Sequence, residues 1–167
     1  MSKRARISYG LLIGLINSIL EEEVYMANTS ILTKYIYPYA LKEVSRNIGI
    51  QLVEKKLLIG NPVKEKKFDG VSSDIKTILS IFTSSGLSAS GKNPVGKINA
   101  LYACCFLMNQ TEAQRKILAF TNEEFMSIIL NKSKPFLDGF ELMYIPLTEE
   151  LRQMNDAVSK NASNEMG

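Results

Sequence analysis

The sequence of 167 residues contains no histidine and no tryptophan. Without histidine the chain cannot build a Ser-His-Asp triad or a Cys-His pair, and it lacks the commonest metal ligand of proteins. These absences exclude a large part of hydrolytic and metal-dependent chemistry. We therefore expect a protein that is not an enzyme and that uses no cofactor or metal.

Only two cysteines occur, and they are neighbours, Cys104 and Cys105, inside an apolar run. A disulfide between adjacent residues would be strained, so the sequence favours two buried thiols and a reducing compartment. The basic N-terminus, with Lys3, Arg4 and Arg6, is not followed by a small-residue cleavage site. We expect a protein that is not secreted.

Long hydrophobic runs are also missing. The apolar run near the N-terminus, Ile7–Leu20, has 14 residues, whereas a membrane-spanning helix needs about 20. The spacing of Leu and Ile over Ser8–Glu23 predicts an amphipathic helix, which either packs into the core or docks on an anionic lipid surface. For the second interpretation, the predicted membrane-binding residues are Lys3, Arg4, Arg6, Leu11, Leu12 and Leu15.

The overall composition is that of a folded protein, with 46% hydrophobic and 22% charged residues. We expect one globular domain over residues 1–158 and a frayed polar tail over residues 159–167. Residues 1–67 hold 11 Lys and Arg against 6 Asp and Glu, whereas residues 121–167 hold 4 against 8. This asymmetry favours head-to-tail self-association or docking of the basic front on an anionic surface, and ordinary solvated faces are the alternative.

The pattern of apolar residues predicts the α+β class, with a small antiparallel sheet packed against four or five helices. The strands are expected over Ile31–Val44, Ile48–Ile59 and Phe140–Ile145. Tyrosines alternate around Pro38 in the first of them, which is typical of an edge strand. Residues Lys64–Lys67 are expected to form a short charged connector.

Beyond the N-terminal region, helices are expected where a capping residue precedes apolar residues at helical spacing. They are Ser72–Ser84, Pro94–Asn109, Thr111–Phe120, Asn122–Leu130 and a last helix that Thr148 begins. The triplet Ser72-Ser73-Asp74 supplies the caps of the first helix. A loop rich in Gly and Ser, Ser84–Gly96, follows it.

This loop contains Gly86-Leu87-Ser88-Ala89-Ser90-Gly91-Lys92, which matches the first seven positions of the phosphate-binding loop of nucleotide-hydrolysing proteins. The eighth position is Asn93, where that motif needs a hydroxyl for magnesium, and the segment before the loop is predicted as a helix instead of the required strand. A nucleotide-binding loop and an exposed surface loop both stay open. A Ser/Lys catalytic pair at Ser88 or Ser90 with Lys92 would need a buried lysine, which such a loop disfavours.

The same region offers a second comparison, carried by an ungapped window from Ser73 to Ile98. Its matching positions are Ser73, Asp74, Ser80, Gly91, Lys92, Pro94, Lys97 and Ile98. This window resembles the matrix proteins of vesicular-stomatitis-type rhabdoviruses, in which a Ser-Asp-led helix runs into a Gly-Lys-x-Pro-x-x-Lys-Ile stretch. It covers about a sixth of the chain, and the Pro-Pro-x-Tyr budding motif and the long N-terminal arm of better-known members are missing.

The resemblance implies a short, divergent viral matrix protein, similar to those of plant-infecting relatives. Such a structural protein of the virion self-associates, binds the viral nucleocapsid and links it to the anionic inner face of the membrane during virus assembly in the host cytoplasm. The predicted self-association loop comprises Ser88, Ser90, Gly91, Lys92 and Pro94. The alternatives from other classes are a P-loop-like nucleotide-binding enzyme and an intracellular protein-interaction adaptor.

Overall fold

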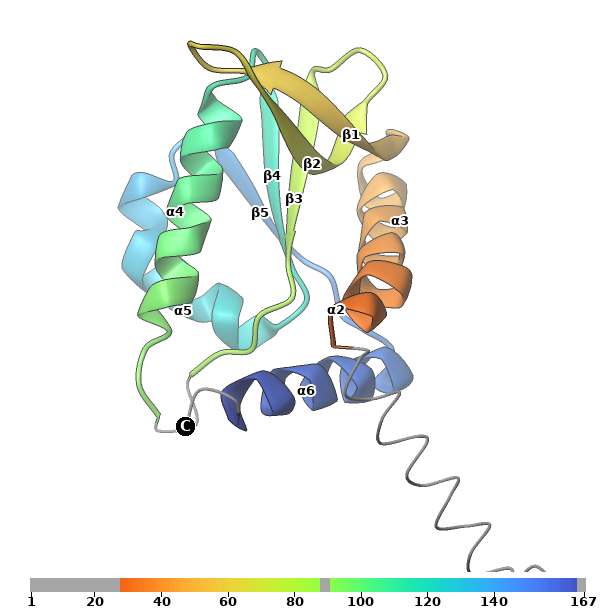
Figure 1. Ribbon diagram of the computed structural model, residues 1–167, viewed down its shortest axis with the longest axis vertical. Coiled ribbons are helices and arrows are strands. Elements are labelled where there is room, and N and C mark those ends of the chain that lie inside the picture. Colours follow the sequence, from red (N-terminus) through yellow and green to blue (C-terminus); the bar gives the residue numbers. More distant parts are fainter. Residues whose placement is uncertain (1–27, 88–90, 165–167) are drawn as a thin grey trace, which may run out of the picture.

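The computed structural model describes residues 28–87 and 91–164 (Figure 1). In chain order the elements are α2 (Asn28–Ile31), the π-helical turn η1 (Leu32–Ile36), α3 (Tyr37–Ile48), β1 (Leu52–Ile59), β2 (Lys64–Ser72), β3 (Thr77–Phe82), α4 (Val95–Asn109), β4 (Arg115–Phe120), α5 (Glu123–Ser133), the 3-10 turn η2 (Lys134–Phe136), β5 (Phe140–Tyr144) and α6 (Glu149–Asn164).

The five strands form one mixed sheet in the order β1-β2-β3-β4-β5. The pairs β1–β2 and β2–β3 are antiparallel and joined by turns, whereas β3–β4 and β4–β5 are parallel. The parallel pairs follow from the helices α4 and α5 between them, because a parallel pair needs a long crossover. The predicted α+β class is confirmed, with four helices of eight or more residues within residues 28–87 and 91–164, but the prediction of an antiparallel sheet is wrong.

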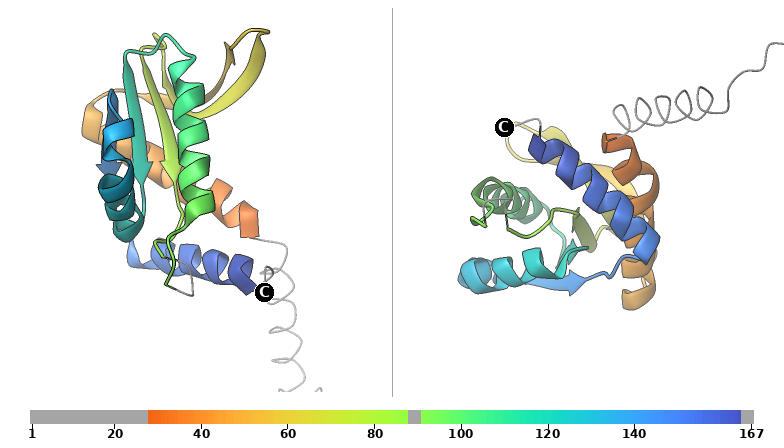
Figure 2. Two further views of the ribbon diagram at one scale, coloured as in Figure 1. Left: turned by 90° about the vertical axis from the view of Figure 1, so that its left-hand side faces the viewer. Right: turned by 90° about the horizontal axis from the view of Figure 1, so that it is seen from below.

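Helices cover both faces of this sheet (Figure 2). On one face, Leu101 and Met108 of α4 and Phe125 of α5 pack with Phe68 and Ile78 of the sheet. On the other face, Ala40 and Val44 of α3 pack against a second set, Leu52, Leu79, Ile81, Ile117, Ala119 and Ile145. Right-handed crossovers that advance in one direction place both connecting helices on the same face, which explains why α4 and α5 lie together.

Helix α6 crosses the end of the sheet where the parallel strands finish (Figures 1 and 2). Asn155 of α6 is buried, and its Nδ2 donates a hydrogen bond of 3.0 Å to the carbonyl oxygen of Thr83, just after β3. Thr148 begins this helix as predicted, since its Oγ1 accepts a hydrogen bond of 3.3 Å from the N–H of Leu151. The helix therefore closes the end of the sheet opposite to the β1–β2 turn.

The expected strand Ile31–Val44 is helical, so this prediction is wrong. The buried side chains Ile36, Ala40 and Val44 lie four residues apart and face the sheet, which is the helical period. The alternation of tyrosines around Pro38 misled the prediction, because Pro38 occupies the first turn of α3, where proline needs no N–H partner.

The prediction of a helix over Ser72–Ser84 is also wrong, since Thr77–Phe82 forms the central strand β3. Asp74 Oδ1 accepts hydrogen bonds from the N–H of Lys76 at 3.0 Å and from Ser72 Oγ at 2.6 Å, so the supposed caps build a turn between strands. Ser and Asp side chains serve turns and helix starts alike, which explains the error. Residues Lys64–Lys67 are not a connector but begin β2.

The expected helical segment Thr111–Phe120 contains β4 instead. Ile117, Leu118, Ala119 and Phe120 are all 0% exposed, because helices cover the strand on both faces. A strand buried on both faces has no alternation, and its short apolar run cannot be told from a buried helical turn. The parallel pairing with β3 decides in favour of the strand.

The remaining predicted elements are present with small shifts in their bounds. Within Ile48–Ile59 the strand β1 begins at Leu52, α4 begins at Val95, directly after Pro94, and Phe140–Ile145 forms β5 to Tyr144. Asn122 caps α5 as expected, and its Oδ1 accepts a hydrogen bond of 2.8 Å from the N–H of Phe125. The predicted helix Ser8–Glu23 lies outside the described residues.

Candidate functional site

The β1–β2 hairpin bends away from the sheet and its turn lies above the C-terminal end of α4 (Figures 1 and 2). Its register changes between Val53, which pairs with Val71, and Lys55, which pairs with Phe68. Two residues of β2 therefore oppose one residue of β1. Such a bulge increases the twist of a strand pair, which accounts for the bend of the hairpin.

The register separates the lysines of the hairpin into two groups. Lys56 and Lys67 lie opposite one another on the outer face. Each forms a cross-strand ion pair there, Lys56 with Glu65 at 3.0 Å and Lys67 with Glu54 at 2.8 Å. The outer face of the hairpin is consequently close to neutral.

Three other lysines lie on the inner face, toward α4. Lys55, Lys66 and Lys64 are the partners across the strands of Phe68, Leu57 and Ile59, three apolar residues that pack with the core beneath α4. Within the described residues none of these three lysines forms an ion pair. The positive charge that is not neutralised by an ion pair is therefore concentrated on the side of the hairpin that faces α4.

The same end of the molecule exposes three large apolar side chains. Leu58 and Val63 beside the hairpin turn are 72% and 63% exposed, and Phe106 near the end of α4 is 65% exposed. A depression of about 430 Å³ lies between the turn and α4, and its lining includes Ile59, Pro62, Lys64, Lys66, Phe106 and Leu107. We call the hairpin residues 55–67 together with Phe106 the basic tip.

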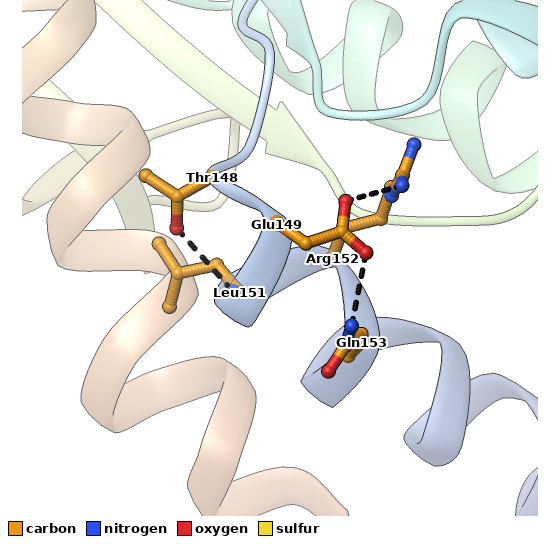
Figure 3. A network of polar contacts seen from close by, with 5 residues as sticks. All are labelled: Thr148, Glu149, Leu151, Arg152 and Gln153. Carbon is orange, nitrogen blue, oxygen red and sulfur yellow. Dashed lines mark hydrogen bonds and ion pairs between the residues drawn. The ribbon is translucent and has the colours of Figure 1, made fainter.

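The opposite end of the molecule, which we call the acidic end, carries carboxylates at the starts of two helices. Glu123 and Glu124 occupy the first turn of α5, and Glu149 and Glu150 the first turn of α6, where the helix dipole favours negative charge. Glu149 also binds Arg152 and accepts a hydrogen bond of 2.9 Å from Gln153 Nε2 (Figure 3). The predicted pairing of a basic front with an acidic tail stays a prediction.

The basic tip is missed by the sequence prediction, and the predicted membrane-binding residues Lys3, Arg4, Arg6, Leu11, Leu12 and Leu15 lie outside the described residues. A usable signal was present in the sequence, because Gly60-Asn61-Pro62 separates two segments of similar length, as in a hairpin. Treating Lys64–Lys67 as a connector concealed it.

The loop that resembles a phosphate-binding loop does follow a strand and precede a helix. It lies between β3 and α4, so the prediction of a preceding helix is wrong. Gly91 and Lys92 are exposed, whereas Pro94 is buried at the start of α4. Ser88 and Ser90 lie outside the described residues. The structure therefore describes three of the five predicted self-association residues, and the role of this loop stays a prediction.

A carboxylate occupies the beginning of this loop. Glu124 Oε2 accepts a hydrogen bond of 3.2 Å from the N–H of Leu87, and a Cβ atom at Gly86 would lie only 1.8 Å from that oxygen. In nucleotide-binding loops such N–H groups point at phosphate. Here the negative charge of Glu124 lies where phosphate would have to approach, which disfavours nucleotide binding.

Three further titratable groups, Asp69, Cys104 and Cys105, lie within the packed part of the fold. Asp69 Oδ2 accepts a hydrogen bond of 2.8 Å from the N–H of Ile81, at the point where the β2–β3 pairing ends. Burial raises the pKa of Asp69 despite this bond. Cys104 Sγ donates to Ser80 Oγ at 3.1 Å, and burial raises the pKa of Cys105 to about 12. Both thiols stay protonated at neutral pH and are poor nucleophiles.

Comparison of the chain with models of known protein families, with curated proteins and with solved structures finds no match. Over residues 28–87 and 91–164, no cluster of three acidic or cysteine residues is arranged to hold a metal ion. No helix within these same ranges is long and apolar enough to cross a membrane. The basic tip combines lysines without an ion pair and exposed apolar side chains on one surface of the described structure.

Proposed function

We propose that the protein is a matrix-type structural protein that self-associates and links a viral nucleocapsid to the inner face of a membrane, and that the basic tip contacts the lipid. The observation that carries this proposal is the combination of Lys55, Lys64 and Lys66, which form no ion pair in the described structure, with the exposed side chains of Leu58, Val63 and Phe106. The sequence resemblance over Ser73–Ile98 supports the viral assignment through its matched residues alone, because the Ser-Asp-led helix of that family is here a turn followed by β3.

The physical chemistry of an anionic bilayer matches this combination. A lysine near the surface of an anionic membrane contributes roughly 1 kcal/mol of attraction, so three lysines give a significant but salt-sensitive affinity. Apolar side chains at the tip then enter the boundary between headgroups and acyl chains, which adds hydrophobic burial. The acidic end, with Glu123 and Glu149, faces away from the membrane in this orientation.

Co-sedimentation of the full chain with liposomes tests the proposal. We expect binding to vesicles that contain anionic phospholipid, no binding to neutral vesicles, and release at about 1 M salt, where the screening length is about 3 Å. The variant Lys64→Glu/Lys66→Glu should lose most of this binding. Its matched control is Lys132→Glu/Lys134→Glu, which changes the net charge equally at the exposed end of α5.

Equal loss of binding in both variants would show that only net charge matters, and would contradict a role for the basic tip. Unchanged binding in both would assign the contact to another part of the chain, with the N-terminal residues Lys3, Arg4 and Arg6 as the next variants to make. No binding of the parent chain under any condition would remove the membrane role and favour a protein-interaction adaptor.

A nucleotide-binding protein is the second candidate, because Gly86–Lys92 lies between a parallel strand and a helix, as the motif requires. Titration with a magnesium nucleotide tests it. Binding that is lost in Lys92→Ala would favour this function. Absence of binding in the parent chain and in Glu124→Gln, which removes the opposing charge, would exclude it.

A further inference from the structure

The two edges of the sheet differ in how well they are protected against pairing with another strand. The edge strand β1 carries Glu54, Lys55 and Lys56 in its centre and lies opposite a bulge. Charged side chains and bulges are the usual means by which proteins block edge-to-edge association. The β1 edge is therefore protected.

The other edge strand, β5, has the sequence Phe-Glu-Leu-Met-Tyr and none of these devices. Its single charged residue, Glu141, is already neutralised by Arg115 on the neighbouring strand, with two hydrogen bonds of 2.7 and 2.8 Å. Seen from below, β5 runs along the margin of the described molecule, away from the hairpin (Figure 2). An apolar edge with unpaired N–H and C=O groups is a template for another strand.

The apolar side chains of the core are also partly exposed to solvent at this edge. The apolar residues of β5 belong to the clusters on the two faces of the sheet, Phe140 and Leu142 on one and Met143 on the other, yet all are only partly buried. Tyr144 is 38% exposed. Addition of a strand beside β5 would remove part of this apolar surface from water, which is favourable.

The direction of the free backbone groups follows from one hydrogen bond. The N–H of Ile145 donates to the carbonyl oxygen of Phe120 at 2.8 Å, toward β4. Because successive residues of a strand direct their N–H and C=O groups to opposite sides, those of Leu142 and Tyr144 point outward, away from the sheet. The N–H of Phe140 donates to Leu137 at 3.1 Å, but its C=O points outward as well.

These outward groups match a second copy of the same strand. In an antiparallel pair with its two-fold axis at Leu142, each Leu142 lies opposite its equivalent, and each Phe140 lies opposite Tyr144 of the other copy. Glu141 then lies opposite Met143, so no like charges meet. Aromatic cross-strand pairs and the absence of opposed like charges both stabilise such a register.

We infer that β5 is a dimerisation edge, at which two copies of the chain join their sheets through antiparallel pairing centred on Leu142. The N–H groups of Leu142 and Tyr144 donate to the C=O groups of Leu142 and Phe140 of the other copy. This isologous contact closes on itself as a two-fold dimer. The inference rests on the proposed function for its purpose, since it names the surface of self-association, and it leaves both basic tips free.

Sedimentation velocity of the full chain without lipid is the first test, and we expect a dimer. Tyr144→Lys places a charge in the edge and should give a monomer, whereas Val53→Lys, an equal change at a half-exposed position of β1, should stay dimeric. A monomeric parent chain at the highest soluble concentration would overturn the inference. So would a dimer that Tyr144→Lys leaves intact.

Oxidative cross-linking tests the register itself. Residues in a hydrogen-bonded antiparallel pair have Cα atoms about 5.5 Å apart, within the range a disulfide spans. Leu142→Cys should therefore form a covalent dimer. Glu141→Cys is the matched control, because its equivalent would lie about 8 Å away, too far for a disulfide. Equal cross-linking of both variants, or none at Leu142→Cys, would contradict the register.

Different results would contradict the proposed dimer and the proposed membrane role. If Tyr144→Lys is monomeric but still binds anionic vesicles, only with lower apparent affinity, both proposals stand. Loss of vesicle binding in Lys64→Glu/Lys66→Glu with an intact dimer shows that the two surfaces are separate. If the chain forms a dimer but binds no vesicle, the dimerisation at β5 is supported and the proposed membrane role is contradicted.

Discussion

Glu124 on α5 and Leu87 in the loop after β3 are joined by a hydrogen bond of 3.2 Å, in which the backbone N–H donates to the carboxylate. The Glu124 side chain lies so close to Gly86 that a Cβ atom there would overlap it. The bond therefore depends on the absence of a side chain at residue 86. It connects the loop before α4 to the start of α5.

The first prediction concerns this contact. Gly86→Ala should lower the free energy of unfolding by about 1 kcal/mol, because the flexible Glu124 side chain swings out and its hydrogen bond is lost. The double variant Gly86→Ala/Glu124→Ala should be little worse than Glu124→Ala alone, and urea denaturation measures this coupling. Strictly additive effects would show that the two residues are independent.

The second prediction concerns Ile75, which has a positive φ of 61° although it is β-branched. This left-handed conformation costs an ordinary L-residue about 1–2 kcal/mol, whereas Asn tolerates it. Ile75→Asn should therefore raise the free energy of unfolding by about 1 kcal/mol. Lys76→Asn in the same turn is the control and should bring no gain. Equal effects in the two variants would refute the strain argument.

The third prediction concerns the pH dependence that Asp69 contributes. Burial raises the pKa of Asp69 in the folded protein, so the native state binds the proton more tightly than the unfolded chain. The contribution of this group to stability is therefore lost as the pH rises from the unfolded pKa through the folded one. Asp69→Asn keeps an oxygen for the N–H of Ile81 and carries no charge.

Thermal unfolding of this variant and of the parent chain at two pH values checks the prediction. Asp69→Asn should melt at a higher temperature than the parent at pH 7, and the difference should shrink at pH 4, where more of the Asp69 population is protonated. Thr77→Ser, at a buried site without a charge, controls for general changes of the sheet. A difference that is independent of pH would contradict the argument.

The fourth prediction concerns the two thiols. Because burial raises the pKa of Cys104 and of Cys105, the latter to about 12, the folded protein should react slowly with iodoacetamide at pH 8. In denaturing urea both cysteines should react rapidly. Mass spectrometry after a short exposure measures the number of labelled thiols. Rapid labelling of the folded chain would contradict the burial of the two thiols.

The sequence predicts those elements whose signal is local. Asn122 before Glu123 and Glu124 marks the start of α5 because capping and dipole act within one turn. Pro94 before an apolar run marks the start of α4 because proline, which lacks an N–H, is tolerated at the start of a helix and not in its interior. Alternation identifies β5, since it is an edge strand whose side chains are only partly buried.

The remaining elements depend on contacts that are distant in sequence. Thr77–Phe82 and Arg115–Phe120 become strands because they pair with each other and are covered from both faces, which no local pattern shows. The basic tip was missed because the register of the two strands decides which lysines form ion pairs. Lys56 and Lys67 pair with carboxylates across the strands, whereas Lys55 and Lys64 do not. A single sequence contains no record of such pairings.

The spatial order of the strands, β1 to β5, is the same as their order along the chain. No strand has to be inserted between two others, so each can be added to an existing edge as synthesis proceeds. The hairpin that carries the basic tip comes first, and β5, with its unprotected edge, comes last. A nascent chain would thus present its lysines before it could pair with another copy, which separates the two events in time.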